Sequence, residues 1–211
     1  MDFNDVYPER KNYVDLYGPG PVPGYLDGGD ITLGIPLLCG KLPKQGTIVE
    51  VGSFLGKSAT QWAKNLKMIG KDYKIICIDN FSSKKEILHD LMQCAKFAIP
   101  NKDYSHMELF RHYTSAYPNI KPVRACFNDR FAFPAKVELV FEDSTHEQGY
   151  LSYALPFWWD KIVPGGILAG HDYWFDEVES SVELFAALHD VEVKTFDQDK
   201  DNCSIWYIEK K

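Results

Sequence analysis

The sequence predicts an α/β fold, in which a doubly wound, mostly parallel sheet of seven strands ends in an antiparallel C-terminal hairpin. From residue 47 onward, short β-branched or apolar runs alternate with segments of helical periodicity, and this alternation is typical of a parallel sheet covered by helices. The last two strand-like runs are joined by only a few residues, which is too short for a parallel crossover. The 211 residues are enough for one domain with a sizeable core.

The chain begins with a polar segment that is rich in Gly and Pro, including YGPGPVPGYLDGGD before residue 31. So many Gly and Pro residues in a short segment do not support regular secondary structure. We therefore expect residues 1–30 to form an irregular lead-in, either a lid over a binding site or a disordered tail. Residues 31–211 would form the main domain, and a short helix over 30–42 would lead to the first strand.

Strands and helices then follow in turn. The apolar runs predict strands over 47–51, 73–79, 123–127, 137–143, 165–173, 191–197 and 203–210. Helical spacing predicts helices over 57–69, 84–99, 103–117, 149–162 and 175–190. Pro100 should separate the second helix from the third, Pro156 should interrupt the fourth, and the turn VPGG should precede the fifth strand.

The bulk composition narrows the function classes. The net charge of -7 argues against a nucleic-acid-binding protein, whose usual mark is a basic face. The five cysteines show no zinc-ligand spacing, and their scattered, largely apolar surroundings indicate reduced thiols in a cytoplasmic protein. No apolar stretch is long enough to cross a membrane, and the N-terminus lacks the apolar core of a signal peptide. We expect no nucleic-acid or membrane partner.

The loop after the first predicted strand, in IVEVGSFLGKSATQWA, faces the ligand side of such a sheet, because ligands bind outside the carboxyl ends of parallel strands. Gly52 and Gly56 allow its backbone to approach a ligand closely, and Ser53 and Ser58 offer hydroxyls at the start of the next helix. The G-x-x-x-G spacing matches neither the dinucleotide-binding pattern nor a P-loop. Glu50, just before the loop, would repel a pyrophosphate and suits a ligand with ammonium and sulfonium groups.

A second acid, Asp79, ends the second predicted strand, 29 residues after Glu50. A carboxylate at this point can accept hydrogen bonds from both hydroxyls of a ribose. The alternative is that Glu50 and Asp79 only cap the helices that follow them. Because both acids lie at strand ends that face the ligand, we favour a binding role for the pair.

Polar side chains also follow the fourth and fifth predicted strands. Asp143 ends the fourth strand and His146 comes three residues later, while His171 and Asp172 end the fifth strand. Because these two strand ends flank the ligand site, the four side chains should converge where a second substrate would bind. The adjoining aromatic residues of the segment YW, at 173 and 174, are candidates for the wall of its pocket.

Between residues 48 and 174, the segments VEVGSFLGKSA, ICIDNF, LVFEDSTHEQGY and VPGGILAGHDYW resemble the class I S-adenosylmethionine-dependent methyltransferases. More narrowly, they are similar to the small-molecule O-methyltransferase branch, which includes catechol-type enzymes and enzymes of sugar and antibiotic tailoring. The resemblance implies a Rossmann-like methyltransferase fold with S-adenosyl-L-methionine as cofactor. The implied activity is methylation of a small hydroxylated acceptor, a sugar or a phenol.

The resemblance also implies roles for individual residues. The cofactor-binding set that it assigns is Glu50, Gly52, Ser53, Gly56, Ser58, Asp79, Asn128, Asp129 and Asp143. Asn128 and Asp129 follow the third strand, where this family contacts the adenine, although an Asx-turn is the alternative for this pair.

A metal site is implied in the same way. In catechol-type relatives, acids at these strand ends hold a magnesium ion, and that pattern maps onto Asp143, His171 and Asp172. His171 departs from the pattern, because an acid is usual there and an imidazole is a softer ligand that suits zinc, manganese, iron or nickel better than magnesium. Without a metal, His146 or His171 would act as the general base. Both alternatives stay open at this point.

Two other functions remain as alternatives. One is an NAD(P)-dependent oxidoreductase, which the missing third glycine and the position of Glu50 disfavour. The other is a non-catalytic module that binds S-adenosylhomocysteine, which the four polar residues at two strand ends disfavour. The oligomeric state is left open, and the aromatic-rich sequence allows a homo-oligomer.

Overall fold

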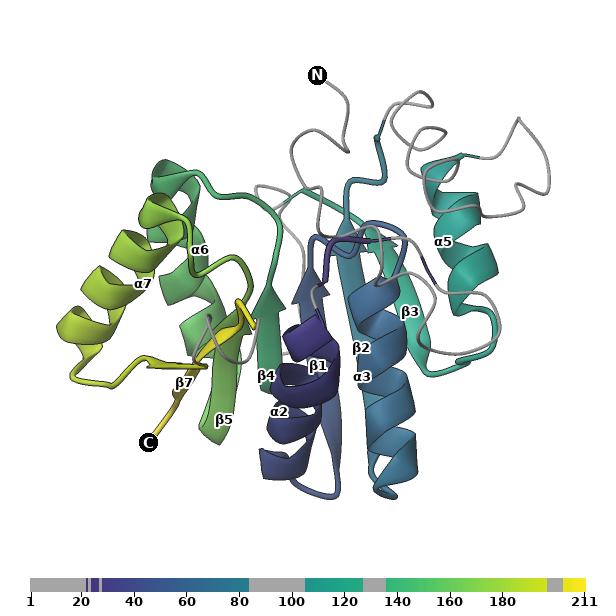
Figure 1. The fold of residues 1–211 in the computed structure, drawn as a ribbon, viewed down its shortest axis with the longest axis horizontal. Helices are drawn as coiled ribbons and strands as arrows, with labels where there is room; N and C mark the ends of the chain where they lie inside the picture. Colours follow the sequence, from purple (N-terminus) through teal and green to yellow (C-terminus); the bar gives the residue numbers. More distant parts are fainter. Residues whose placement is uncertain (1–21, 23, 27, 84–104, 127–135, 197–202) are drawn as a thin grey trace.

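A seven-stranded sheet with helices on both faces forms the framework of the protein. The computed structural model describes residues 22, 24–26, 28–83, 105–126, 136–196 and 203–211. The strands are β1 (Gln45–Val51), β2 (Asp72–Asp79), β3 (Ile120–Arg124), β4 (Val137–Glu142), β5 (Ile162–Gly170), β6 (Lys194–Thr195) and β7 (Trp206–Glu209). Their order in the sheet is β3-β2-β1-β4-β5-β7-β6 (Figure 1). The first five strands pair in parallel, and β7 is antiparallel to β5 and β6, which confirms the predicted fold class.

The helices cover the sheet in two groups. They are the π-helical turn η2 (Asp30–Gly34), α2 (Ile35–Lys41), α3 (Lys57–Met68), α5 (His106–Thr114), α6 (Gln148–Lys161) and α7 (Asp176–His189). In Figure 1, α2 and α3 lie over one face of the sheet, and α6 and α7 lie together at its β5–β7 end. None of the helices in the described ranges has the length and hydropathy of a membrane span.

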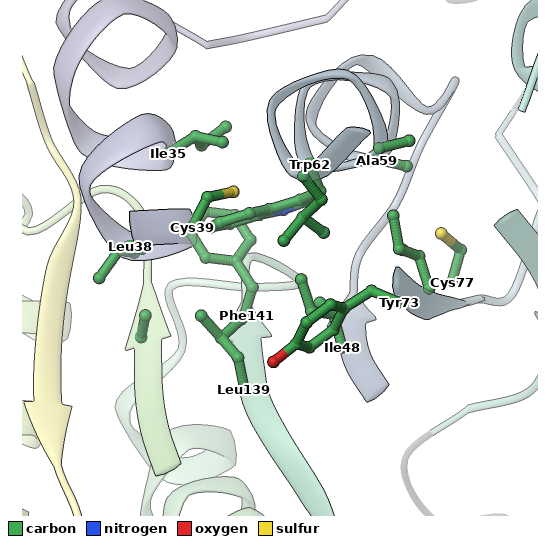
Figure 2. Close-up of a cluster of buried hydrophobic side chains, with 14 of the residues drawn as sticks. Ile35, Leu38, Cys39, Ile48, Ala59, Trp62, Tyr73, Cys77, Leu139 and Phe141 are labelled. Carbon is green, nitrogen blue, oxygen red and sulfur yellow. The ribbon is translucent and has the colours of Figure 1, made fainter. Parts of the chain in front are cut away.

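Two large clusters of buried side chains form most of the core, one on each face of the sheet, and a small third cluster contains Leu55 and Leu109. Successive residues of a strand point to opposite faces, so Ile48 of β1 joins the cluster under α2 and α3, and Val49 joins the cluster under α6 and α7. Figure 2 shows the first cluster, where Trp62 of α3 packs edge-on against Phe141 of β4 with ring centroids 5.3 Å apart. Each large apolar side chain buried in this way contributes about 1.5–3 kcal/mol of transfer free energy.

The switch point of the strand order lies at β1. Its neighbours are β2 on one side and β4 on the other, so the connections after β1 and β4 leave the sheet in different directions. This divergence opens a crevice at the carboxyl ends of the strands, where α/β proteins bind their ligands. Glu50, Asp79 and Asp143 all lie at or directly after these strand ends.

Two predicted strands are displaced by three residues toward the N-terminus in the structure, and the last strand is shorter, at Trp206–Glu209 rather than 203–210. The third strand covers Ile120–Arg124 rather than 123–127, because its pairing with β2 runs from Ile75↔Ile120 to Asp79↔Arg124. The position of β3 at the edge of the sheet tolerates Pro122. The fifth strand begins at Ile162, so VPGG lies inside it as an irregularity in the β4–β5 register rather than before it as a turn.

Other elements differ in extent. The helix α6 continues through Pro156, whereas an interruption was expected; buried side chains on both sides of Pro156, including Leu151 and Trp158, hold the segment against the sheet. The first strand of the C-terminal hairpin is only the two residues Lys194–Thr195. The helix expected over 103–117 is shorter, at His106–Thr114. The helix expected over 84–99 lies outside the described residues.

Candidate active site

A cavity of about 590 Å³ opens at the carboxyl ends of the strands. It is lined by seven of the residues predicted to form the site: Gly52, Ser53, Ser58, Asp79, Asp143, His146 and Asp172. A second cavity of about 240 Å³ adjoins it and shares Gly52, Asp79, Asn80 and Ser144. The structure therefore brings both halves of the predicted site, the loop after β1 and the ends of β4 and β5, to one continuous hollow.

The loop after β1 depends on its two glycines. Gly52 has φ +86°, and a Cβ built on it would overlap the main-chain carbonyl of Asp143. Gly56 has φ +87° and caps the start of α3, where a Cβ would press on Thr114 and Phe110 of α5. Side chains are excluded at both positions by conformation and by space. The loop can therefore lie directly against the end of β4, which places backbone and hydroxyl groups at the cavity.

Asp79 is held by the backbone of two loops. Its Oδ2 accepts a hydrogen bond of 2.8 Å from the amide of Phe54, and its Oδ1 accepts one of 2.7 Å from the amide of Phe81. Phe54 and Phe81 both have positive φ, at 45° and 48°. Each carboxylate oxygen has further acceptor capacity, so Asp79 can still face a ribose while it joins the loops after β1 and β2.

Glu50 is completely buried at the end of β1. Neither carboxylate oxygen has a hydrogen-bond partner among the described residues. Burial raises the pKa of Glu50 to about 7, and the nearby Ser53, Ser58 and Trp62 oppose that shift without reaching hydrogen-bond geometry. An unpaired buried acid is costly unless something neutralises it. Glu50 is therefore suited to bind a cationic group.

Directly after β5, His171 lies at the centre of a buried cluster of charged side chains. Its Nε2 lies 2.8 Å from Oδ2 of Asp30 and 2.8 Å from Oγ of Ser204. Its Nδ1 lies 3.2 Å from Oδ1 of Asp172 and 3.7 Å from Oδ1 of Asp143. His171 and Asp30 are both fully enclosed, at 4% and 0% exposed. Three carboxylates therefore surround one imidazole.

The electrostatics of this cluster favour a positive charge at its centre. Burial by itself lowers the pKa of His171, but the carboxylates of Asp143 and Asp30 outweigh burial and raise this pKa well above its usual range. Burial also opposes ionisation of Asp172, yet the hydrogen bonds and charges of His171 and His146 lower its pKa to about 2. Desolvation raises the pKa of Asp143 well above its usual range. A proton or another cation is needed to balance the cluster.

His146 lies at the more accessible edge of the cavity and is oriented from two sides. Its Nε2 lies 2.7 Å from Oδ2 of Asp172. Its ring stacks on Phe175 with centroids 4.1 Å apart, and Phe175 stacks in turn on Trp174 at 3.9 Å. Because Asp172 is ionised, Nε2 of His146 donates the hydrogen bond and Nδ1 is left as the basic nitrogen. This arrangement is that of a histidine base held by a carboxylate.

The donor set also suits a divalent cation. Asp143, His171 and Asp172 each offer one ligand atom, and these atoms all lie within 4.8 Å of one another. The carboxylate of Asp30 can accept the Nε2 proton of His171, which leaves Nδ1 directed at the two acids. At metal sites, a carboxylate commonly accepts the N–H of the ring nitrogen that does not bind the metal. The residues present therefore fit a metal, and the mixed nitrogen and oxygen set is compatible with Mn or Zn.

Several site residues were not found from the sequence. Asp30 and Ser204 contact His171 from positions 141 residues before it and 33 residues after it, and no local pattern signals such contacts. His106, buried between the loops after β1 and β2, was also missed. Trp174 lines the larger cavity as expected.

Other predicted positions differ or lie outside the described part. Tyr173 is not among the residues that line the cavity; its hydroxyl donates instead to Glu183 of α7, at 2.5 Å. Glu142, by contrast, points to the opposite face of the sheet from Asp143, as the alternation of side chains along a strand predicts, and there it accepts a hydrogen bond of 3.1 Å from Trp158. The adenine contacts predicted at Asn128 and Asp129 lie outside the described residues.

Comparison with known proteins relates this geometry to a family. A family model described as a methyltransferase domain matches residues 49–173, the span that holds the loop after β1 and the ends of β4 and β5. No curated protein sequence matches the chain significantly.

Similar solved structures are distant in sequence. The O-methyltransferase NovP is 16% identical with a TM-score of 0.62, over 87% of this chain and 80% of its own. An rRNA methylase from Streptococcus thermophilus is 14% identical with a TM-score of 0.55, over 85% of this chain and 95% of its own. The SAH-bound methyltransferase PaMTH1 from Podospora anserina is 16% identical with a TM-score of 0.51, over 84% of this chain and 76% of its own. These likenesses show a shared fold.

Proposed function

The chain belongs to the methyltransferase-domain family, as a class I enzyme that uses S-adenosylmethionine, and from this premise we propose that it methylates a hydroxyl group of a small acceptor. The observation that supports an oxygen acceptor is the pair of His146 and Asp172, joined at 2.7 Å on the wall of the larger cavity. A hydroxyl must lose its proton as it is methylated, and a histidine oriented by a carboxylate is suited to take it.

In the proposed cofactor site, the loop after β1 and Asp79 hold S-adenosylmethionine across the two adjoining cavities. Ser53 and Ser58 place hydroxyls beside it, and Asp79 accepts from the ribose. The buried carboxylate of Glu50 lies beneath this loop and stabilises the positive charge of the cofactor. The backbone approach that Gly52 permits keeps the cofactor close to Asp143 and the acceptor side.

The reaction is an in-line displacement at the methyl carbon. The acceptor oxygen forms a bond to this carbon as the carbon–sulfur bond breaks, and the sulfonium leaves as the neutral thioether of S-adenosylhomocysteine. The hydroxyl proton passes to Nδ1 of His146, whose Nε2–H stays bound to Asp172. The protein contributes mainly by aligning the two reactants and by excluding water.

A divalent metal is compatible with the same site. Asp143, His171 and Asp172 would hold it, and as a Lewis acid it would lower the pKa of the acceptor hydroxyl. His146 would still receive the proton at the cavity edge, and Asp30 would keep His171 in the orientation that presents Nδ1.

The charge of the cavity favours a small uncharged acceptor over a nucleic acid. Its wall carries the carboxylates of Asp79, Asp143 and Asp172. Lys57, which also lines it, donates to the carbonyls of Gly24 and Leu26 at 3.2 Å each. A phosphate backbone needs a positive surface, and the net charge is -7. The lead-in residues that Lys57 contacts also line the cavity, which supports the proposal that the lead-in acts as a lid.

The direct test is release of S-adenosylhomocysteine in the presence of a panel of phenols, sugars, their deoxy or O-blocked analogues, and an rRNA fragment. We expect turnover with at least one hydroxylated small molecule and none with its blocked analogue. His146→Gln should lower kcat by about 10²-fold or more. His112→Gln, which changes an exposed histidine on α5, is the matched control. Methylation confined to the rRNA fragment would contradict the proposed acceptor.

A further inference from the structure

His106 is a buried histidine that belongs neither to the charged cluster around His171 nor to the apolar core. It is the first residue of α5, and only 3% of its surface is exposed. Its N-cap residue Ser105 forms a reciprocal capping box with Glu108, which fixes the start of the helix. The ring therefore projects from a rigid helix terminus.

The two ring nitrogens of His106 contact two different loops. The amide of Ser83, in the loop after β2, donates to Nδ1 at 3.3 Å. Since Nδ1 accepts, the proton of the neutral ring lies on Nε2, which donates to the carbonyl of Phe54 at 2.8 Å. Phe54 lies in the loop after β1. The neutral ring therefore joins the two loops that form the proposed cofactor site.

Phe54 is held at both of its main-chain polar groups. Its amide donates to Asp79, and its carbonyl accepts from His106. The residue has φ 45°, a conformation that costs a non-glycine residue free energy and needs outside support. The His106 ring also packs edge-on against Phe54 and Phe81, with centroids 5.3 Å and 5.2 Å away. Phe81 is the other positive-φ residue that donates to Asp79.

We propose that His106, in its neutral form, is a positioning residue for S-adenosylmethionine, because it locks the loops after β1 and β2 in the conformation that directs Asp79 at the ribose. This inference rests on the proposed cofactor site and is independent of the acceptor. His106 is absent from the residues that line either cavity, so it acts through Phe54 and Ser83 rather than by contact with the cofactor.

The proposal makes cofactor binding sensitive to pH. A second proton, on Nδ1, would face the donating amide of Ser83 and break that hydrogen bond. Burial lowers the pKa of His106, the charge of Asp79 at the end of β2 opposes this, and the charge of Arg124 at the end of β3 adds to it. The hydrogen bonds of His106 to the two loops are therefore intact at neutral pH, and the bond from Ser83 is lost only below the usual titration range of histidine.

The test compares two variants for binding of S-adenosylhomocysteine by calorimetry between pH 5 and 8. His106→Phe keeps the ring but removes both hydrogen bonds, and it should weaken binding by about 10-fold or more at pH 7.5. His106→Gln keeps a donor for the Phe54 carbonyl and does not titrate. It should bind within about threefold of wild type at pH 7.5, and it should not show the loss of affinity that protonation of His106 causes in wild type at the acid end of the range.

The outcomes separate the two proposals. If His106→Phe binds like wild type, or if His106→Gln loses the same affinity on acidification as wild type does, the positioning role is wrong. If wild type itself does not bind S-adenosylhomocysteine at any pH, the proposed cofactor site fails and this inference fails with it. Thermal unfolding of both variants identifies a folding defect, and the pH comparison with His106→Gln decides the question even if His106→Phe does not fold.

Discussion

Replacement of Glu50 by Gln tests whether a buried charge is kept for the cofactor at the expense of stability. The pKa of Glu50 is raised from 4.5 to about 7 by burial. At about 1.36 kcal/mol for each pH unit, ionised Glu50 destabilises the folded protein by about 3 kcal/mol. Gln has nearly the same shape, and it removes the charge without breaking a hydrogen bond, because neither Glu50 oxygen has one among the described residues.

The sign of the effect depends on pH. Well below pH 4.5, Glu50 is protonated in both the folded and the unfolded state, so its burial then carries no ionisation cost. The cost grows as the pH rises toward 7 and is complete above it. Glu50→Gln should therefore be more stable than wild type by about 3 kcal/mol at pH 8 and by roughly half of that at pH 5.5. Urea unfolding at the two pH values measures both differences.

The same variant should bind the cofactor less well. Loss of a hydrogen-bonded partner for a charged group is worth about 1.5–3 kcal/mol, so S-adenosylhomocysteine should bind about 10-fold to 100-fold more weakly by calorimetry. A variant that is no more stable than wild type at pH 8 would refute the desolvation argument. A variant that is more stable but binds equally well would refute the cofactor role. Glu142→Gln is the contrast: burial raises the pKa of Glu142 to about 7 as well, but its oxygens accept from Ser144 and Trp158, so the loss of these bonds should offset part of the gain in stability.

Three further predictions concern the loop and the acceptor side. Gly52→Ala should lower the free energy of unfolding, measured by urea titration, by about 2–5 kcal/mol, because φ at this position is positive and the added Cβ would overlap the end of β4. Gly70→Ala is the control: φ there is +68° but the Cβ would lie in open space, so the cost should be only about 1–2 kcal/mol. Asp172→Asn should lower kcat by about 10²-fold or more; an unchanged kcat would exclude Asp172 as the partner of the base. Asp30→Ala should lower the free energy of unfolding by about 3 kcal/mol or more, because it removes the fully buried carboxylate beside Nε2 of His171. Calorimetry would show this as a fall in Tm of roughly 6–12 °C, and a smaller fall would show that Asp143 and Asp172 are enough to balance His171.

The parts of the site that sequence could predict are those set by local patterns. Glu50, Gly52 and Asp79 follow strands whose apolar runs are unambiguous, and the ends of parallel strands meet at one edge of the sheet. Asp143 and Asp172 follow from the same reasoning. Gly52, Asp79, Asp143 and Asp172 line the larger cavity, whereas Glu50 is buried at the end of β1 and lines neither cavity. The element types were predictable for the same reason.

What could not be predicted depends on pairing between distant parts of the chain. The boundaries of β3 follow from its register on β2, which no residue of β3 specifies alone. Whether Tyr173 faces the cavity or α7 depends on the turn at Asp172, which has φ 58°. The partners of His171 come from η2 and from the segment before β7. The role of His106 depends on two loop conformations that are themselves set by Asp79.

The contacts around His171 determine when, during folding, this part of the site can be assembled. Asp30 accepts from the amide of Ser204, 174 residues further along the chain, and His171 lies between them. Contacts of such large sequence separation form late, because the chain must first close a long loop. Until Ser204 is in place, the buried carboxylate of Asp30 and the imidazole of His171 each lack one hydrogen-bond partner. The cluster is therefore complete only when η2 and the segment before β7 have both docked on the sheet.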